Sequence, residues 1–219
     1  MKWEREPKRT LNIQNASDYK GQLGQHGNDF WHNTDKVFIV NGQCNKADGN
    51  FLSPFFYKEI GNLDIVLGSY PSTWDDISQI NHLGCTAVLD LQTSNDHHQR
   101  EVNPHEQKNW YQTMGIHRVA NVQVSDIFED EYAQQLFEAV QILHKMKDVE
   151  KHKVFVHCSA GISRGPTLLI VYLSLYLKLN VSENVQQVMD YVESEFIWED
   201  ANLKVAKYVV DTHPEIQQE

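Results

Sequence analysis

The segment from 156 to 166 holds the residues whose types and spacing best suit chemistry. It reads Val-His-Cys-Ser-Ala-Gly-Ile-Ser-Arg-Gly-Pro, with five residues between Cys158 and Arg164. A thiolate is an intrinsically strong nucleophile, and the planar fork of an arginine can hold two oxygens of one phosphate. Gly161 supplies the backbone freedom for a tight curl between them. The pattern predicts a loop in which Cys158 attacks a phosphate that Arg164 binds.

The elements on either side of this loop favour the same chemistry. A short buried strand is predicted at 153–156 and an apolar helix from about 165 to 179. Ligands of α/β sheets bind at the carboxyl ends of strands, and a helix that begins there aims N–H groups and its positive dipole end at one point. That setting favours a bound phosphate and the thiolate form of Cys158. The alternative, a buried structural cysteine followed by a chance arginine, explains neither the spacing nor the flanking elements.

From Leu63 onward the chain alternates between strand-like and helix-like segments. This alternation predicts an α/β fold with a central, mostly parallel β-sheet and helices on both faces. Strands are expected at 63–67, 86–91, 116–124 and 153–156, with one more at 36–40. Helices are expected from Ser72 or Thr73 to Gly84, from Pro104 to Gly115, at 130–147, from about 165 to 179, at 182–195 and at 201–211. The stretch after 91, rich in Asn, His and Gln, reads as a polar loop.

Composition narrows the partners and the compartment. A formal net charge of −11 disfavours binding to nucleic acid and docking on an anionic membrane surface. Three dispersed cysteines do not make a disulfide framework, so a reducing compartment is expected. The polar N-terminus does not resemble a signal peptide, and the longest apolar run, 168–179, is too short to span a bilayer. We expect a cytoplasmic protein.

The segment His157-Cys-Ser-Ala-Gly-Ile-Ser-Arg164 resembles the active-site signature of the dual-specificity phosphatases. The resemblance extends over about 63–210 and implies hydrolysis of phosphate monoesters through a phosphocysteine intermediate, without a metal or cofactor. It implies that His157 orients the loop. The phosphate-binding loop it implies consists of Ser159, Ala160, Gly161, Ile162 and Ser163.

The family also places an aspartate after the third strand as general acid for the leaving oxygen. Here that loop reads Gln123-Val-Ser-Asp-Ile-Phe-Glu-Asp130, and Asp126 matches in position. Asp126 as a simple turn residue, or Glu129 or Asp130 as the acid, are the alternatives. We favour Asp126 as the acid and Asp130 as the N-cap of the next helix.

Within the family, several segments resemble the glucan phosphatases, which include laforin and the plant starch phosphatases. Residues 64–71, Asp-Ile-Val-Leu-Gly-Ser-Tyr-Pro, are similar to their leucine/valine-Gly-Ser-Cys-Pro segment. Residues 84–96 resemble laforin's Gly-Ile-Thr-Ala-Val-Met-Asn-Phe-Gln-Thr stretch, and Gly165-Pro166 resembles the Ala-Pro of the plant enzymes. The resemblance implies a phosphorylated glucan, such as glycogen or starch, as substrate.

Two positions depart from that branch. Ser163 is typical of protein-directed dual-specificity phosphatases, so a phosphoprotein substrate is the alternative. Gly165 stands where most of the wider family carries a serine or threonine, whose hydroxyl stabilises the leaving thiolate. We therefore expect slow breakdown of the phosphoenzyme. A catalytically inactive binding module is disfavoured because Cys158, Arg164 and Asp126 are all present.

Sugar rings stack on aromatic side chains, so a glucan phosphatase requires aromatic platforms. The candidates are Tyr70, Trp110, Tyr111, Phe128 and Trp198, for each of which core packing is the alternative. We expect a catalytic domain over 61–213. The N-terminal extension over 1–60 is interpreted either as a remnant carbohydrate-binding module or, preferably, as a segment packed on the catalytic domain.

Overall fold

A computed structural model provides the structure of the chain. It describes residues 11–13, 38–40, 46–47, 50–51, 55, 57–60, 63–99, 103–125, 130–159, 161, 163–178 and 200–216. The expected helix at 182–195 and most of the extension over 1–60 lie outside these residues. Two short antiparallel pairs fall within 1–60: β1 (Leu11–Ile13) with β2 (Phe38–Val40), and β3 (Lys46–Ala47) with β4 (Asn50–Phe51).

The centre of the fold is a five-stranded sheet in the order β5-β6-β9-β7-β8. Strands β6 (Ile65–Gly68), β9 (Val154–His157), β7 (Ala87–Asp90) and β8 (Arg118–Asn121) run parallel to one another. Every residue of β6, β7 and β9 is buried, as expected for parallel strands covered on both faces. The edge strand β5 (Tyr57–Glu59) is antiparallel to β6 and was not predicted.

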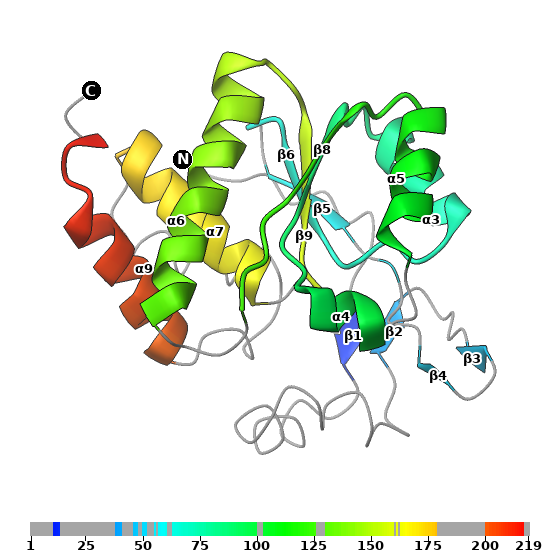
Figure 1. Ribbon diagram of the computed structural model, residues 1–219, viewed down its shortest axis with the longest axis horizontal. Helices are drawn as coiled ribbons and strands as arrows, with labels where there is room; N and C mark the ends of the chain where they lie inside the picture. The colour runs from blue at the N-terminus through cyan, green and yellow to red at the C-terminus, as the bar shows by residue number, and fades with distance from the viewer. Residues whose placement is uncertain are drawn as a thin grey trace.

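Helices cover both faces of this sheet, which confirms the predicted fold class (Figure 1). One face packs against α6 (Asp130–His144) and α7 (Arg164–Tyr176), and α9 (Asp200–Thr212) packs against these two helices. The other packs against α3 (Trp74–His82) and α5 (Pro104–Thr113). Neighbouring strand residues alternate between the two cores: Leu67 and Val156 face the first, Val66 and Phe155 the second. No helix among the described residues is long and apolar enough to cross a membrane.

Local sequence signals account for where several helices begin and end. Thr73 caps α3 through a capping box, in which its hydroxyl accepts from the backbone N–H of Asp76 and the Asp76 carboxylate accepts from the N–H of Thr73. Pro104 opens α5, as predicted. Gly84 and Gly115 follow α3 and α5 with φ values of 77° and 80°, a left-handed conformation that favours glycine.

Two segments differ from expectation. Residues 94–99, predicted as a polar loop, form the short helix α4 (Ser94–Gln99). Its start is stabilised by a second capping box, in which Thr93 Oγ1 accepts from the N–H of Asp96 at 3.2 Å and the Asp96 carboxylate accepts from the N–H of Thr93 at 2.8 Å. Helix α6 continues beyond His144 as one π-helical turn, η1 (Lys145–Val149).

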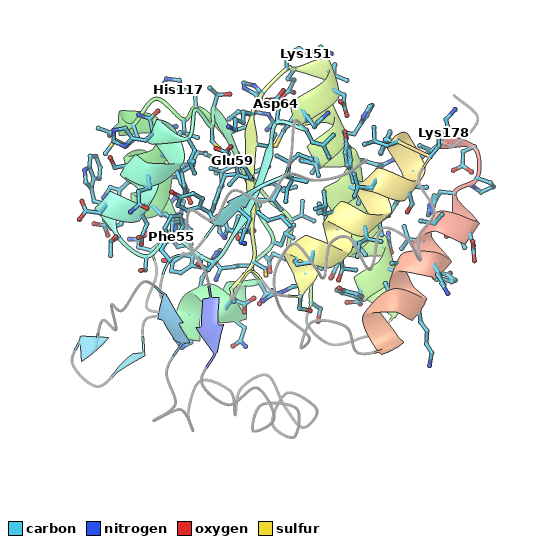
Figure 2. The ribbon with its side chains drawn as sticks, turned by 180° about the vertical axis from the view of Figure 1, so that it is seen from behind. Phe55, Glu59, Asp64, His117, Lys151 and Lys178 are labelled. Atoms are coloured by element: carbon cyan, nitrogen blue, oxygen red, sulfur yellow. The ribbon has the colours of Figure 1, made fainter. Side chains whose placement is uncertain are left out.

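Different parts of the chain lie at the two ends of the sheet. Asp64 and Lys151, labelled in Figure 2, precede β6 and β9 and mark the amino-terminal end of these strands. The backbone N–H of Val154 donates to the carbonyl of Asp64, which joins the two strands at this end. The opposite, carboxyl-terminal end carries α4 (Figure 1), and β9 ends there at His157, directly before Cys158.

Candidate active site

The cysteine-arginine loop lies at the carboxyl end of the central strand, as predicted. Strand β9 ends at His157 and α7 begins at Arg164, so the loop between them faces the positive end of the α7 dipole. Cys158 is only 2% exposed. The thiol therefore sits at the base of a loop that can bind an oxyanion, where water has little access.

Gly161 lets the loop pack against the neighbouring strand β6. Its φ is 74°, and a Cβ atom built there would lie 2.6 Å from the carbonyl oxygen of Gly68 and 2.8 Å from the nitrogen of Ser69. Real Cβ atoms do not approach backbone so closely, so a larger residue would push the loop away from β6. The backbone N–H of Tyr70 donates to the carbonyl of Ser159 at 3.1 Å and closes the same contact.

His157 supports the backbone beneath the nucleophile. Its Nδ1 lies 3.2 Å from the carbonyl oxygen of Cys158. In the tautomer that is protonated at Nδ1, this N–H donates to the carbonyl. Burial lowers the pKa of His157, against the opposing effect of the Asp90 carboxylate 3.7 Å away. Asp90 in turn contacts His97 Nε2 at 3.0 Å. This geometry fits the loop-orienting role that the sequence suggests for His157.

Arg164 is 1% exposed, and its two terminal nitrogens make several hydrogen bonds within the protein. Nη1 donates to Asp96 Oδ2 at 2.8 Å and to the carbonyl oxygens of Leu91 and Val124 at 3.2 and 3.1 Å. Nη2 donates to Asp96 Oδ1 and to Ser159 Oγ at 3.2 and 3.1 Å. The guanidinium is thus fixed by groups at the ends of β7, β8 and the loop itself.

Asp96 and Gln92 are site residues that the sequence reasoning missed. Ser159 Oγ donates to Asp96 Oδ1 at 2.9 Å and accepts from Gln92 Nε2 at 3.2 Å. Burial acts to raise the pKa of Asp96, but the hydrogen bonds and charge of Arg164, with hydrogen bonds from Thr93, hold it well below its ordinary value. A signal was present, because residues 93–96 form a Thr-x-x-Asp capping box directly after a buried strand.

The structure places only part of the predicted site. Cys158, Ser159, Gly161, Ser163 and Arg164 lie together in one loop. Three other predicted residues, Ala160, Ile162 and the proposed acid Asp126, lie outside the described residues. The carbonyl of Val124, two positions before Asp126, accepts from Arg164, so the described end of that segment reaches the site.

The described residues include three of the five predicted aromatic platforms. Tyr70 and Tyr111 are 6% and 1% exposed, so neither presents a ring face to a sugar, and for these two the platform prediction is wrong. Tyr111 instead belongs to the core under α3 and α5. Trp110 is half-buried and packs edge-on against Trp74, with ring centroids 6.4 Å apart. Phe128 and Trp198 lie outside the described residues.

Comparison with known proteins identifies the family of the chain. Residues 65–204 match the family described as "Dual specificity phosphatase, catalytic domain", which covers more than half of the chain. The chain belongs to the dual-specificity phosphatase family, and it carries the catalytic domain of a phosphoric monoester hydrolase.

Curated relatives include dual specificity protein phosphatase 26 of Homo sapiens, which is 31% identical over 81 residues. The same protein of Bos taurus is 30% identical over 81 residues. Each match covers 37% of this chain and 38% of the relative, so the chain matches less than two fifths of the length of these proteins.

Solved structures share the fold at low sequence identity. The active form of Tk-PTP has a TM-score of 0.55 at 17% identity and covers 67% of this chain and 91% of its own. The core catalytic domain of the PP-IP phosphatase SIW14 from S. cerevisiae has a TM-score of 0.57 at 16% identity, over 74% of this chain and 88% of its own. Kinase associated phosphatase has a TM-score of 0.57 at 16% identity, over 71% and 88%. These likenesses establish the fold.

Proposed function

We propose that the chain is a cysteine-dependent phosphatase that removes phosphate from tyrosine and serine or threonine side chains of proteins. The observation that carries the proposal is the loop between β9 and α7, which holds the buried thiol of Cys158 and the buried guanidinium of Arg164 at its two ends. Ser163 in the same loop and the matched relatives named protein phosphatases support a protein substrate.

The proposed reaction has two steps. The Cys158 sulfur forms a bond to phosphorus while the bond from phosphorus to the leaving oxygen breaks, and Asp126 gives that oxygen a proton. A water oxygen then attacks phosphorus, the sulfur leaves as thiolate, and Asp126 takes a proton from the water. Arg164 and the loop N–H groups bind the phosphoryl oxygens throughout. The products are the free alcohol or phenol and inorganic phosphate.

The glucan substrate that the sequence suggested has weaker support. Two of its five proposed platforms, Tyr70 and Tyr111, are buried. The curated relatives above are named protein phosphatases, which favours the alternative. One observation keeps a glucan among the substrates to be tested: Trp74 is 41% exposed and contacts Trp110, so this pair offers some aromatic surface at the start of α3.

A substrate panel tests the proposal. Phosphate release is measured from a phosphotyrosine peptide, a phosphothreonine peptide, a phosphorylated glucan and a small aryl phosphate, with Cys158→Ser as the control. We expect turnover of the peptides and the aryl phosphate by the wild-type chain and none by the variant. Release confined to the glucan would overturn the protein substrate. Full activity of Cys158→Ser would overturn the cysteine mechanism.

A further inference from the structure

The terminal edge of the Arg164 guanidinium is held by one carboxylate. Asp96 on α4 accepts from both Nη1 and Nη2, at 2.8 and 3.2 Å, in a two-pronged pair. We propose that Asp96 is a positioning residue, which fixes the plane and direction of Arg164 so that the guanidinium is ready to bind the phosphoryl group. This inference rests on the proposed function only in that Arg164 binds phosphate.

The ion pair between Arg164 and Asp96 is largely buried, and it holds Arg164 in one orientation. The side chains of Arg164 and Asp96 are 2% and 17% exposed, so the ion pair is largely removed from water. An isolated guanidinium at this depth would be costly to bury, and the carboxylate offsets its charge. Because Arg164 has several rotatable bonds, holding it in one orientation before the phosphate arrives removes an entropic cost from binding.

Asp96 itself has little freedom to move. Its carboxylate accepts from the backbone N–H and the hydroxyl of Thr93, both at 2.8 Å, and from the hydroxyl of Ser159 at 2.9 Å. Hydrogen bonds to Arg164 and Thr93 also hold its pKa below the ordinary value, so the group stays charged at neutral pH. Asp96, which is fixed at the start of α4, therefore sets the position of the Arg164 guanidinium.

The opposite role, in which Asp96 occupies the place of the phosphate and must leave before it binds, fits the contacts less well. Nη1 also donates to the carbonyls of Leu91 and Val124, which belong to the backbone next to β7 and β8. These carbonyls contact Nη1 alone, whereas Asp96 accepts from both terminal nitrogens, so the carbonyls assist an orientation that the Asp96 carboxylate fixes. A phosphate thus meets an arginine whose terminal edge is already bound to the protein.

A capping role alone is the competing explanation, and the chain contains its own control. Asp96 closes a Thr-x-x-Asp capping box with Thr93, and Asp76 closes the same kind of box with Thr73 at the start of α3. The described contacts of Asp76 are with Ser72 and Thr73 and do not include an arginine. Asp76→Asn therefore reports the effect of weakening a capping box, and Asp96→Asn reports that effect together with any loss of Arg164 positioning.

The experiment uses the full chain, with a small aryl phosphate as substrate and tungstate as a competitive phosphate analogue. For Asp96→Asn we expect kcat/KM to fall by about 10- to 100-fold and the tungstate inhibition constant to rise by about 10-fold or more, since the guanidinium is misplaced. For Asp76→Asn we expect kcat/KM and the tungstate inhibition constant to stay within about two-fold of the wild-type values. A change of that size is too small to reflect a lost transition-state contact.

Three results would overturn the proposal. First, Asp96→Asn could have the same kcat/KM and the same tungstate inhibition constant as Asp76→Asn, which would mean that Asp96 acts only as a helix cap. It could bind tungstate more tightly than the wild type, which would make Asp96 a competitor of phosphate. If Asp96→Asn does not fold, Asp96→Glu decides, because a longer side chain cannot keep both contacts without moving Arg164: unchanged tungstate inhibition would then refute positioning.

The wild-type chain separates this proposal from the proposed function. Failure of the wild type to hydrolyse the aryl phosphate or to bind tungstate would count against the phosphatase itself. Normal wild-type behaviour with no selective effect at Asp96 would count against the positioning role alone.

Discussion

At the residue scale, the chemistry of the site depends on a few side chains whose types and spacing are visible in the sequence. Cys158 and Arg164 flank a curl that only glycine at 161 permits, because a Cβ there would lie 2.6 Å from a backbone oxygen of β6. These local requirements are what made the loop predictable. Asp96 was missed because its partner, Arg164, is 68 positions away and meets it only through the sheet topology.

Gly165 offers a direct test at this scale. The structure leaves room for a Cβ atom, which would meet only Leu67 Cδ2, at an ordinary contact distance of 3.6 Å. We expect Gly165→Ser to speed breakdown of the phosphoenzyme by about 10-fold, because a hydroxyl can then stabilise the leaving thiolate. Rapid-quench kinetics should show a smaller phosphoenzyme burst than in the wild type.

Gly165→Ala is the matched control. It adds the same Cβ without the hydroxyl, and it should leave the burst unchanged while stabilising α7 by up to about 1 kcal/mol. Equal burst amplitudes in the serine and alanine variants would show that the hydroxyl is irrelevant to this chain.

Cys85 should be chemically inert in the folded protein. It is 1% exposed, and burial raises its pKa to about 12, so the reactive thiolate is scarce near neutral pH. We expect iodoacetamide at pH 8 to leave Cys85 unmodified in the native chain and to modify it in denaturant, as mass spectrometry of the peptides can show. Equal labelling in both states would contradict the burial of this thiol.

At the element scale, strongly patterned segments were predictable and short polar ones were not. The helices that begin at Thr73 and Pro104 follow from their caps and from the glycines that end them. Helix α4 has only six residues and no apolar periodicity, so its polar composition resembled a loop. Strand β5 has three residues and owes its place to pairing with β6, which no local pattern encodes.

The π-helical turn η1 offers a test of how elements are held together. The hydroxyl of Tyr172 on α7 donates to Asp148 Oδ2 of η1 at 2.7 Å. We expect Tyr172→Phe to destabilise the chain by about 1 kcal/mol, a lost hydrogen bond to a partly exposed carboxylate. That loss should lower the thermal midpoint by about 2–4 °C.

Tyr208→Phe, at an exposed tyrosine of α9, is the control and should leave the thermal midpoint unchanged. The kcat/KM for an aryl phosphate should be equal in Tyr172→Phe and the wild type. A midpoint equal to that of Tyr208→Phe would mean that the Tyr172–Asp148 contact contributes nothing to stability.

At the scale of the whole molecule, the sheet brings separate parts of the chain to one end. The loop after β9, the helix after β7 and the segment after β8 all contact the Arg164 guanidinium. The alternation of strands and helices was sufficient to predict this α/β architecture and the end of the sheet at which the loop between Cys158 and Arg164 begins. Substrate choice was not predictable in the same way, because the sequence does not distinguish aromatic residues exposed on the surface from those that the fold buries, such as Tyr70 and Tyr111.

The most direct test of the account is to identify the phosphorylated residue during turnover. The wild-type chain is mixed with an aryl phosphate, quenched in acid within milliseconds and digested, and its peptides are analysed by mass spectrometry. We predict one phosphoryl group on Cys158, absent from Cys158→Ser, which should also release no phosphate. A phosphoryl group on another residue, or phosphate release by Cys158→Ser at the wild-type rate, would contradict the central claim.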